Sequence, residues 1–363
     1  MNQASGKRVE WIDYARISAI LCVILCHAVE SCYRPVILGE QRIGILPWIV
    51  ENTLFTAGRL GVPVFLCISG ALLLGKEKDV FHFYRKSVLP ILITTEIWIV
   101  LDYFFACIVK DISFSPVELA EEVLFLKDSE LSHMWYMPMI IGIYLVIPFL
   151  SKLVNQYEDS RVFAVPLLLV FVGSVLLPTL NVFLDGQVLD ADELALKIGT
   201  SFNGGVYGLY LLMGYFIGRR KILQRVGTVW LLAVAAFMFV SNSAGQYFLY
   251  SHSLFDSDRL LWYTSVPVFV MGLILFELIR RGQRHIRKFV RFNTAFLAQC
   301  SFGIYLIHKP VMELCTEYLP LDRLNVMLRI IFLFAAGLFV GFAVVAAFRM
   351  KGGKAGRLLF LLK

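Results

Sequence analysis

Repeated apolar runs of about 20 residues, spread over almost the whole chain, constrain its fold more than any other feature. A helical run of this length crosses the hydrocarbon core of a bilayer, because an α-helix rises about 1.5 Å per residue. Of the 363 residues, 58% are hydrophobic and 17% are charged, against roughly 25% charged residues in an average soluble domain. The sequence therefore predicts an all-α, polytopic membrane protein.

The apolar runs predict about ten transmembrane helices around a polar cavity. No long polar segment remains for a separate soluble domain, so we expect a single integral-membrane domain over residues 1–363. The sixth run is short and rich in glycine, which suits close helix packing. In chain order, the expected spans are 14–33, 48–74, 87–109, 134–155, 162–180, 203–218, 229–250, 259–279, 294–316 and 326–348.

The net charge of +7 is unevenly distributed, and this unevenness predicts a topology. With ten spans, five basic clusters fall on the side of the N-terminus, which the positive-inside rule assigns to the cytoplasm. We therefore expect both termini to be cytoplasmic, the loops at 110–133 and 181–202 to lie outside, and the protein to reside in the cytoplasmic (inner) membrane. Anionic membrane lipids are the partners that these clusters indicate, and no nucleic acid is needed to explain them. The clusters read KRVEW, GKEKDVFHFYRKS, GRRKILQR, RRGQRHIRKFVR and RMKGGKAGR.

The cysteines do not indicate a metal site or a disulfide framework. There are seven of them, an odd number, and no two have the CxxC spacing. Most lie inside apolar spans, where cysteine behaves as a small packing residue. We expect no metal.

Ionisable residues within the spans are the next informative feature. Each costs about 2.5–3.5 kcal/mol on insertion scales and usually faces a protein interior or a water-filled cavity. The first span carries Asp13, Arg16 and His27 on one helical stripe, with Glu30 one turn further on. Arg16 and His27 are eleven residues apart, or about 16 Å along the helix. One helix therefore places cationic and titratable groups at two different depths in the membrane.

Polar residues on other spans extend this pattern, although each also has a structural explanation. Asp13 and Arg16 form a possible interfacial pair, and Trp135 suits an aromatic belt at the membrane surface. Taken together, the residues describe a polar cavity that crosses the membrane, which suits either catalysis or a transport pathway. The composition of the chain does not decide between catalysis and transport. The further residues are Arg59, Glu96, Asp102, His133, His308, Lys309 and Glu313.

Ordered sequence blocks resemble the membrane-bound acyltransferase-3 family. That family has an arginine, ten residues and then a histidine in its first helix, and Arg16 and His27 have this spacing. The matching blocks span essentially the whole chain, and the nearest resemblance is to members that O-acetylate or otherwise O-acylate surface polysaccharides. They read WIDYARISAILCVILCHAVE (11–30), GRLGVPVFLCISGALLL (58–74), HMWYMPMIIGIYLVIPFL (133–150), YLLMGYFIGRR (210–220) and SFGIYLIHKPVM (301–312).

The resemblance implies an acyl-CoA donor from the cytoplasm, most often acetyl-CoA, and an acceptor hydroxyl on a surface or lipid-linked glycan. His27 corresponds to the essential histidine, which we expect to act as general base. Arg16, oriented by Asp13, corresponds to the residue facing the donor. The family's second basic motif is Arg-x-x-Arg, whereas Arg85 and Lys86 here are adjacent. We expect both to contact donor phosphates.

The acceptor is expected at the opposite end of the cavity. There the matching blocks place Arg59, His133, Trp135 and His308, whose rings and hydrogen-bonding groups suit a saccharide. Whether Asp13 or Glu30 partners His27 stays open. The rival functions are a transporter or flippase for a glycan or amino acid, and a membrane-sensing or structural module.

Overall fold

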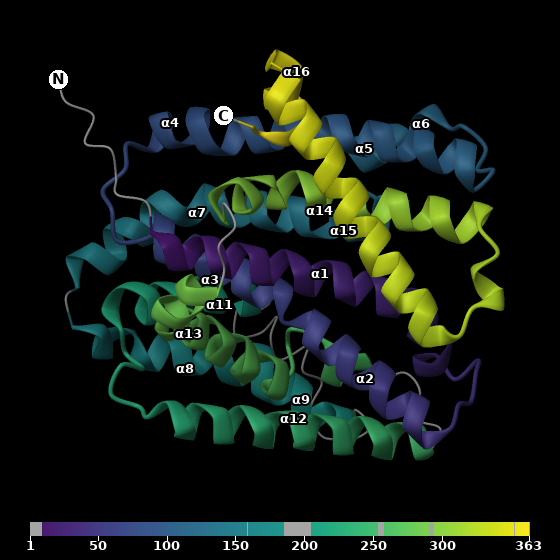
Figure 1. Cartoon of the computed structure of the whole chain (residues 1–363). Coiled ribbons are helices and arrows are strands. Elements are labelled where there is room, and N and C mark those ends of the chain that lie inside the picture. Colours follow the sequence, from purple (N-terminus) through teal and green to yellow (C-terminus); the bar gives the residue numbers. More distant parts are fainter. Residues whose placement is uncertain are drawn as a thin grey trace.

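The computed structural model describes residues 9–157, 159–184, 205–252, 258–289, 294–351 and 353–362. Within these ranges every regular element is helical, and no strand is present (Figure 1). All seven cysteines are free thiols. The all-α prediction is therefore confirmed for this part of the chain.

The first half of the bundle extends from the N-terminal helix to a long helix after the first large loop. This half contains one π-helical segment and one 3-10 segment, and each continues directly into a longer α-helix. The elements are α1 (Glu10–Ile37), α2 (Ile45–Arg59), α3 (Gly61–Leu73), α4 (Val80–Phe83), η1 (Tyr84–Val88), α5 (Leu89–Val109), α6 (Pro116–Val123), η2 (Ser132–Trp135) and α7 (Tyr136–Gln156).

The second half has the same all-helical character. Its elements are η3 (Ser160–Phe163), α8 (Ala164–Phe171), η4 (Val172–Leu176), α9 (Leu177–Leu184), α11 (Gly205–Tyr215), η5 (Phe216–Arg220), α12 (Thr228–Ser251), η6 (Asp258–Leu261), α13 (Val266–Phe289), α14 (Thr294–Tyr318), η7 (Leu321–Arg323), α15 (Val326–Lys351) and α16 (Gly353–Phe360).

Seven helical segments of the described chain are long and apolar enough to cross a membrane. This finding supports a multi-pass membrane protein. The segments are Glu10–Ile37, Ile45–Leu73, Val80–Val109, Ser132–Gln156, Arg161–Phe183, Thr228–Ser251 and Val326–Lys351.

The other three expected spans coincide with helices that are shorter or more polar. The span 203–218 corresponds to α11 and η5, which have only 11 and 5 residues. The spans 259–279 and 294–316 correspond to α13 and α14, whose apolar runs are interrupted by charged side chains such as Glu277 and Lys309. A total of ten crossings stays a prediction, and the expected outer loop 181–202 falls largely outside the described residues.

The second expected span is broken in the middle. α2 ends at Arg59 and α3 begins at Gly61, with Leu60 between them. Pro63 accounts for the break, because proline lacks an N–H to donate to the Arg59 carbonyl and its ring clashes with that carbonyl. The break leaves Arg59 at the end of α2, where it is buried among other helices.

α1 lies at the centre of the bundle and contacts α2, α3, α13, α14 and α15. In Figure 1 the helices α4, α5 and α6 lie along one edge and α12 lies along the opposite edge. A side chain at Gly58 would place its Cβ 2.6 Å from the Cα of Cys26, so glycine there allows α2 to approach α1 closely. Central placement makes α1 the element that positions the site.

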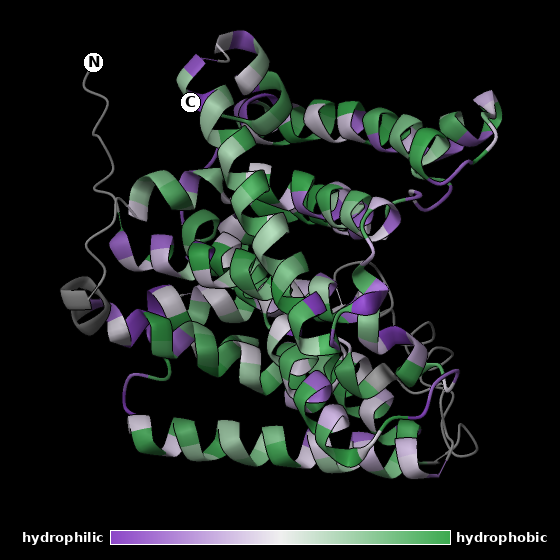
Figure 2. Cartoon of the chain, turned by 45° about the vertical axis from the view of Figure 1, so that its right-hand side comes forward, coloured by the Kyte–Doolittle hydropathy of each residue, from purple (hydrophilic) through white to green (hydrophobic). Residues whose placement is uncertain are grey.

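The outer helices present apolar side chains away from the bundle. Trp230 and Phe237 on α12 are 71% and 67% exposed. Figure 2 shows hydrophobic residues along the long helices, including α12 at the bottom, and hydrophilic residues mainly toward helix ends and loops. This distribution is expected for helices surrounded by lipid, where apolar side chains face the hydrocarbon.

The C-terminal segment folds back onto α5. Thr94 Oγ1 donates a 2.7 Å hydrogen bond to the Leu358 carbonyl, and Trp98 Nε1 donates a 2.8 Å bond to the Leu359 carbonyl. In Figure 1 the start of α1 and the end of α15 lie toward the same side of the bundle. An even number of crossings would produce this arrangement, although which end is cytoplasmic stays a prediction.

Candidate active site

Three histidines from distant parts of the chain meet inside the bundle. His27 belongs to α1, His133 to η2 and His308 to α14. The ring centroid of His27 lies 5.2 Å from that of His308 and 6.4 Å from that of His133, and the latter two are 5.4 Å apart. All three were predicted site residues, and the fold places them together. Within the described residues, no group of three or more His, Cys, Asp or Glu side chains is arranged to hold a metal ion.

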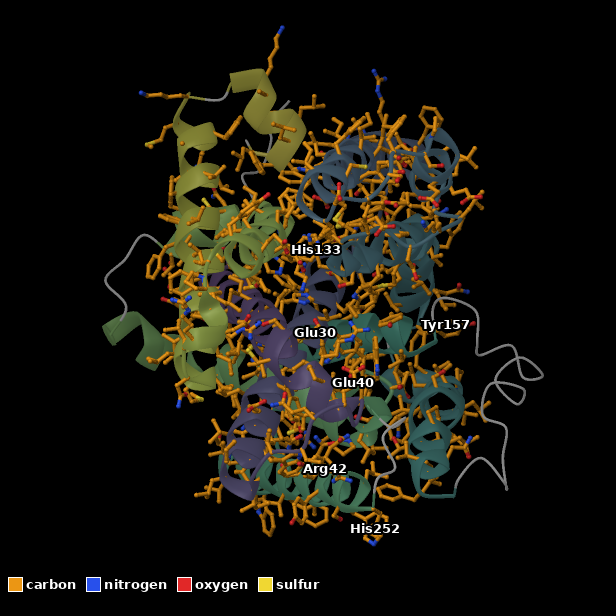
Figure 3. All side chains as sticks on the ribbon, turned by 90° about the vertical axis from the view of Figure 1, so that its right-hand side faces the viewer. Glu30, Glu40, Arg42, His133, Tyr157 and His252 are labelled. Carbon is orange, nitrogen blue, oxygen red and sulfur yellow. The ribbon has the colours of Figure 1, made fainter. Side chains whose placement is uncertain are left out.

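His27 is paired with Glu30, one turn further along α1. The His27 Nδ1 atom lies 2.9 Å from Glu30 Oε2, and both side chains are largely buried. Because an ionised carboxylate only accepts hydrogen bonds, this contact assigns the Nδ1 proton to His27 and leaves its Nε2 as the basic nitrogen. Figure 3 places Glu30 and His133 among the side chains between the ribbons. Of the two carboxylates considered for His27, Glu30 is the one in contact.

Within the described residues, His308 and His133 carry buried ring nitrogens without a hydrogen-bond partner of good geometry. His308 Nδ1 lies 2.6 Å from the Tyr305 carbonyl, so this nitrogen carries the proton and Nε2 is an acceptor. His308 Nε2 and both ring nitrogens of His133 are buried without a hydrogen-bond partner in the described part of the chain. Leaving such a group unpaired costs about 1–3 kcal/mol. Several unpaired imidazole nitrogens close together are typical of a site that binds a polar ligand.

A cavity of about 350 Å³ opens beside His27, and we call it the His27 cavity. Its wall includes the predicted residues Arg59, His133 and Trp135 together with Glu30. His308 is fully buried behind the wall, in contact with the His27 and His133 rings, and does not line the cavity itself. The His27 cavity therefore combines a base, a carboxylate, a guanidinium and aromatic rings.

Aromatic rings surround Arg59, and no carboxylate of the described residues forms an ion pair with it. Its guanidinium carbon lies 4.6 Å from the Phe55 ring centroid, 4.8 Å from that of Trp262 and 5.8 Å from that of Tyr263. Cation–π contacts of this kind stabilise a desolvated guanidinium. Its Nε has no hydrogen-bond partner within the described residues. Arg59 can therefore donate to a ligand in the cavity.

Aromatic side chains form a second part of the same wall. The Trp135 ring stacks on Tyr263, with centroids 5.7 Å apart and an interplanar angle of 27°, and lies 5.8 Å from Tyr207. Flat aromatic faces next to hydrogen-bonding groups suit a ligand with both C–H surfaces and hydroxyls. The cavity has the chemistry expected of a saccharide site.

A second cavity of about 290 Å³ lies toward the other end of α1 and is lined by Arg16, and we call it the Arg16 cavity. Arg16 Nη1 lies 3.7 Å from Asp13 Oδ1, as the i, i+3 spacing predicts. Most other lining residues are apolar, and Leu361 from the C-terminal segment is among them. A cation at one end of an otherwise apolar chamber suits a long ligand with an anionic end.

Further cations lie at the end of α3, next to the Arg16 cavity. Leu72 and Leu73 line that cavity, and the Lys78 ammonium donates to the Leu73 carbonyl. Arg219 Nε donates a 2.7 Å bond to the Ala71 carbonyl. Partial burial, and then repulsion from Arg219, lower the pKa of Lys76. Partial burial lowers the pKa of Lys78 as well, with Lys76 and Arg219 as further causes. Mutual repulsion of this kind is relieved when an anion binds.

Arg85 and Lys86 stand apart from the Arg16 cavity. Both lie in η1 and are exposed, and neither lines either cavity. Ser87, the next residue, does line the Arg16 cavity. The pair therefore directly precedes a residue of the cavity wall, and its contact with donor phosphates stays a prediction.

Several residues of the two cavities were not predicted from the sequence. Trp262 and Tyr263 follow the 3-10 segment before α13. Tyr136 directly follows the predicted Trp135, and Tyr305 lies one turn before the predicted His308 on α14. Aromatic residues are frequent throughout this chain, so composition gave no reason to select these four. Their place in the cavity walls depends on tertiary contacts, which the sequence alone does not show.

The fold and the two cavities define a multi-pass helical membrane protein with a buried cluster of three histidines. The family model described as an acyltransferase domain, that of the acyltransferase-3 family, matches residues 9–348. The chain belongs to this family, as the sequence blocks predicted, and it is a membrane acyltransferase. No curated protein and no solved structure shows a significant similarity to it.

Proposed function

We propose that the protein is an integral-membrane O-acyltransferase of the cytoplasmic membrane. It moves an acyl group, in the first instance acetyl, from cytoplasmic acyl-CoA to a hydroxyl of a surface or lipid-linked glycan. The observation that carries this proposal is the placement of Arg16 and the His27–Glu30 pair on one helix, in two adjoining cavities. One cavity suits an anionic donor and the other suits a saccharide.

The proposed chemistry is a single acyl transfer with His27 as general base. Glu30 holds the Nδ1–H of His27, so Nε2 accepts the proton of the acceptor hydroxyl. The hydroxyl oxygen attacks the thioester carbonyl, a C–O bond forms and the C–S bond breaks. His27 then returns the proton to the leaving thiolate, which departs as CoA–SH. Atoms and charges balance without a metal.

The proposed binding groups follow the chemistry of each cavity. At the donor end Arg16, oriented by Asp13, and the neighbouring Lys76 and Lys78 offer charge-assisted hydrogen bonds to the phosphates of CoA. Arg85 and Lys86 extend this basic surface toward the exposed donor head group and anionic lipid. At the acceptor end Arg59, His133 and His308 supply hydrogen-bonding groups, and Trp135 supplies a ring face for the sugar.

Reconstitution in nanodiscs tests this function. The assay supplies acetyl-CoA labelled in its acetyl group and lipid-linked saccharides extracted from membranes of the host cell. We expect label in the saccharide fraction with the wild type and none with His27→Ala. Liposomes that move saccharide across the bilayer without acyl-CoA, and leave it unlabelled when acyl-CoA is added, would support the transporter alternative and overturn the proposal.

A further inference from the structure

The Arg16 cavity and the His27 cavity share part of their walls. Four residues line both: Val23 from α1, Val62 from α3, Tyr136 from α7 and Tyr305 from α14. Val23 lies seven residues after Arg16 and four before His27, or about 10 Å and about 6 Å along the helix. These four residues therefore lie between the two cavities, and we call them the neck.

The aromatic side of the neck is fixed in position. The Tyr305 hydroxyl donates a 2.5 Å hydrogen bond to the His133 carbonyl, which ties α14 to η2. The Tyr136 ring packs on Tyr305, with centroids 5.8 Å apart and an interplanar angle of 63°. Because the two rings pack against each other, neither can change its orientation without displacing the other.

The aliphatic side is equally restricted. α1 and α3 approach so closely that a Cβ at Gly61 would lie 2.8 Å from Val23 Cγ2. Val23 and Val62 are 5% and 8% exposed, and valine has one strongly preferred rotamer in a helix. The valines therefore have little room to retreat from a bulky group between them.

We propose that this neck selects the donor by the size of its acyl group, so that acetyl passes and longer or branched acyl groups are rejected. The inference rests on the proposed function, in which CoA is held on the Arg16 side and the thioester reacts beside His27. An acyl group must then cross the neck before it reacts. In a close-fitting apolar site, one additional methylene changes kcat/KM by about 10–200-fold, so four rigid side chains suffice for strict selection.

Widening the neck tests the proposal. Purified protein in nanodiscs receives acetyl-, propionyl-, butyryl- or hexanoyl-CoA, with the saccharide extract as acceptor, and kcat/KM is measured for each donor. Val62→Ala removes two methyl groups from the wall, and Tyr136→Leu removes a ring. Val64→Ala is the matched control, because Val64 is a buried valine on the same helix that lines neither cavity.

We expect Val62→Ala and Tyr136→Leu each to raise the butyryl-to-acetyl ratio of kcat/KM by about tenfold or more, and Val64→Ala to leave it unchanged. Val23→Phe narrows the neck and should abolish transfer of every acyl group while CoA still binds. If the wild type transfers acetyl and all variants keep its donor profile, size selection by the neck is wrong although the proposed function stands. If the wild type transfers no acyl group from any donor, size selection by the neck and the proposed function are both wrong.

Discussion

His27 Nδ1 lies 2.9 Å from Glu30 Oε2, and this contact orients the His27 imidazole within α1. At the other end of the same helix, Arg16 Nη1 lies 3.7 Å from Asp13 Oδ1. Both pairs have the i, i+3 spacing that brings two side chains together on one helical face. α1 therefore carries two separate polar pairs, and each one faces a different cavity.

Glu30→Gln tests whether the carboxylate supports the imidazole. A neutral amide keeps the size of the side chain but stabilises the imidazolium less when His27 takes up the acceptor proton. We expect kcat to fall about 10²-fold or more, with the KM for acyl-CoA unchanged, in the labelled transfer assay. An unaltered kcat would mean that Glu30 only fills a polar position at the end of α1.

His133→Ala tests the acceptor end of the His27 cavity. Its ring nitrogens are buried without a hydrogen-bond partner among the described residues, so a bound saccharide is the group expected to satisfy them. Losing one such hydrogen bond should raise the acceptor KM about three- to tenfold. Thermal unfolding of the unliganded variant serves as the control. A marked loss of stability with an unchanged acceptor KM would instead assign His133 to helix packing.

Much of the fold could be predicted from the sequence, because helix length and hydropathy are local properties. Pro63 shows where this reasoning was insufficient. The run 48–74 is apolar on average and was predicted as one span, yet it contains the break between α2 and α3. Hydropathy averages over a window, whereas the loss of one backbone hydrogen bond acts at a single residue.

The candidate site, like the fold, could be predicted only in part from the sequence. His27, Arg59, His133 and Trp135 were selected because ionisable or motif residues stand out against apolar runs, and the fold places them around one cavity. The roles of these residues stay predictions. Tyr305 was not selected, because its contribution to the neck depends on how α14 packs against η2 and α7.

Reporter fusions test the topology. The described chain begins and ends toward the same end of the bundle, and α6, in the expected outer loop, lies at the opposite end (Figure 1). A fusion after Ala120 should therefore report the outer side, and a fusion after Leu362 should report the cytoplasm. A cytoplasmic signal from Ala120 would reverse the assignment of the two cavities to the two sides of the membrane.

The pH dependence of donor binding tests the cations beside the Arg16 cavity. Burial and neighbouring positive charge lower the pKa of Lys76 and of Lys78, and a bound phosphate would favour their charged forms. The Kd for acyl-CoA should therefore rise as the pH increases through these lowered pKa values, below the usual value of about 10.4. Lys76→Arg combined with Lys78→Arg should remove most of this dependence, because arginine stays protonated.

Lys152→Arg is the matched control for that experiment. Lys152 is exposed on α7, directly after Ser151, whose Oγ donates a 3.1 Å bond to the Leu73 carbonyl. It therefore lies at the same end of the bundle, but on α7 and not in the connection between α3 and α4 that contains Lys76 and Lys78. The control should leave the pH profile of binding unchanged. A profile that the double variant does not alter either would exclude Lys76 and Lys78 from donor binding.

The two ends of α1 should respond differently to substitution, because a base and an anion-binding group act at different stages. His27→Ala should abolish transfer while the Kd for acyl-CoA stays close to that of the wild type, since proton removal occurs only as the hydroxyl attacks. Arg16→Ala should raise that Kd about 10–100-fold, with the larger effect at low salt, where a phosphate contact is least screened.

His27→Gln separates catalysis by His27 from positioning by it. Glutamine can keep a hydrogen bond to Glu30 but cannot accept a full proton, so this variant should be nearly as inactive as His27→Ala. Single-turnover transfer and equilibrium acyl-CoA binding, measured on the same nanodisc samples, distinguish the two steps. If His27→Gln transferred acyl groups at the wild-type rate, another group would have to be the base. His308 Nε2, buried beside the His27 ring and without a hydrogen-bond partner in the described part of the chain, would be the first to test.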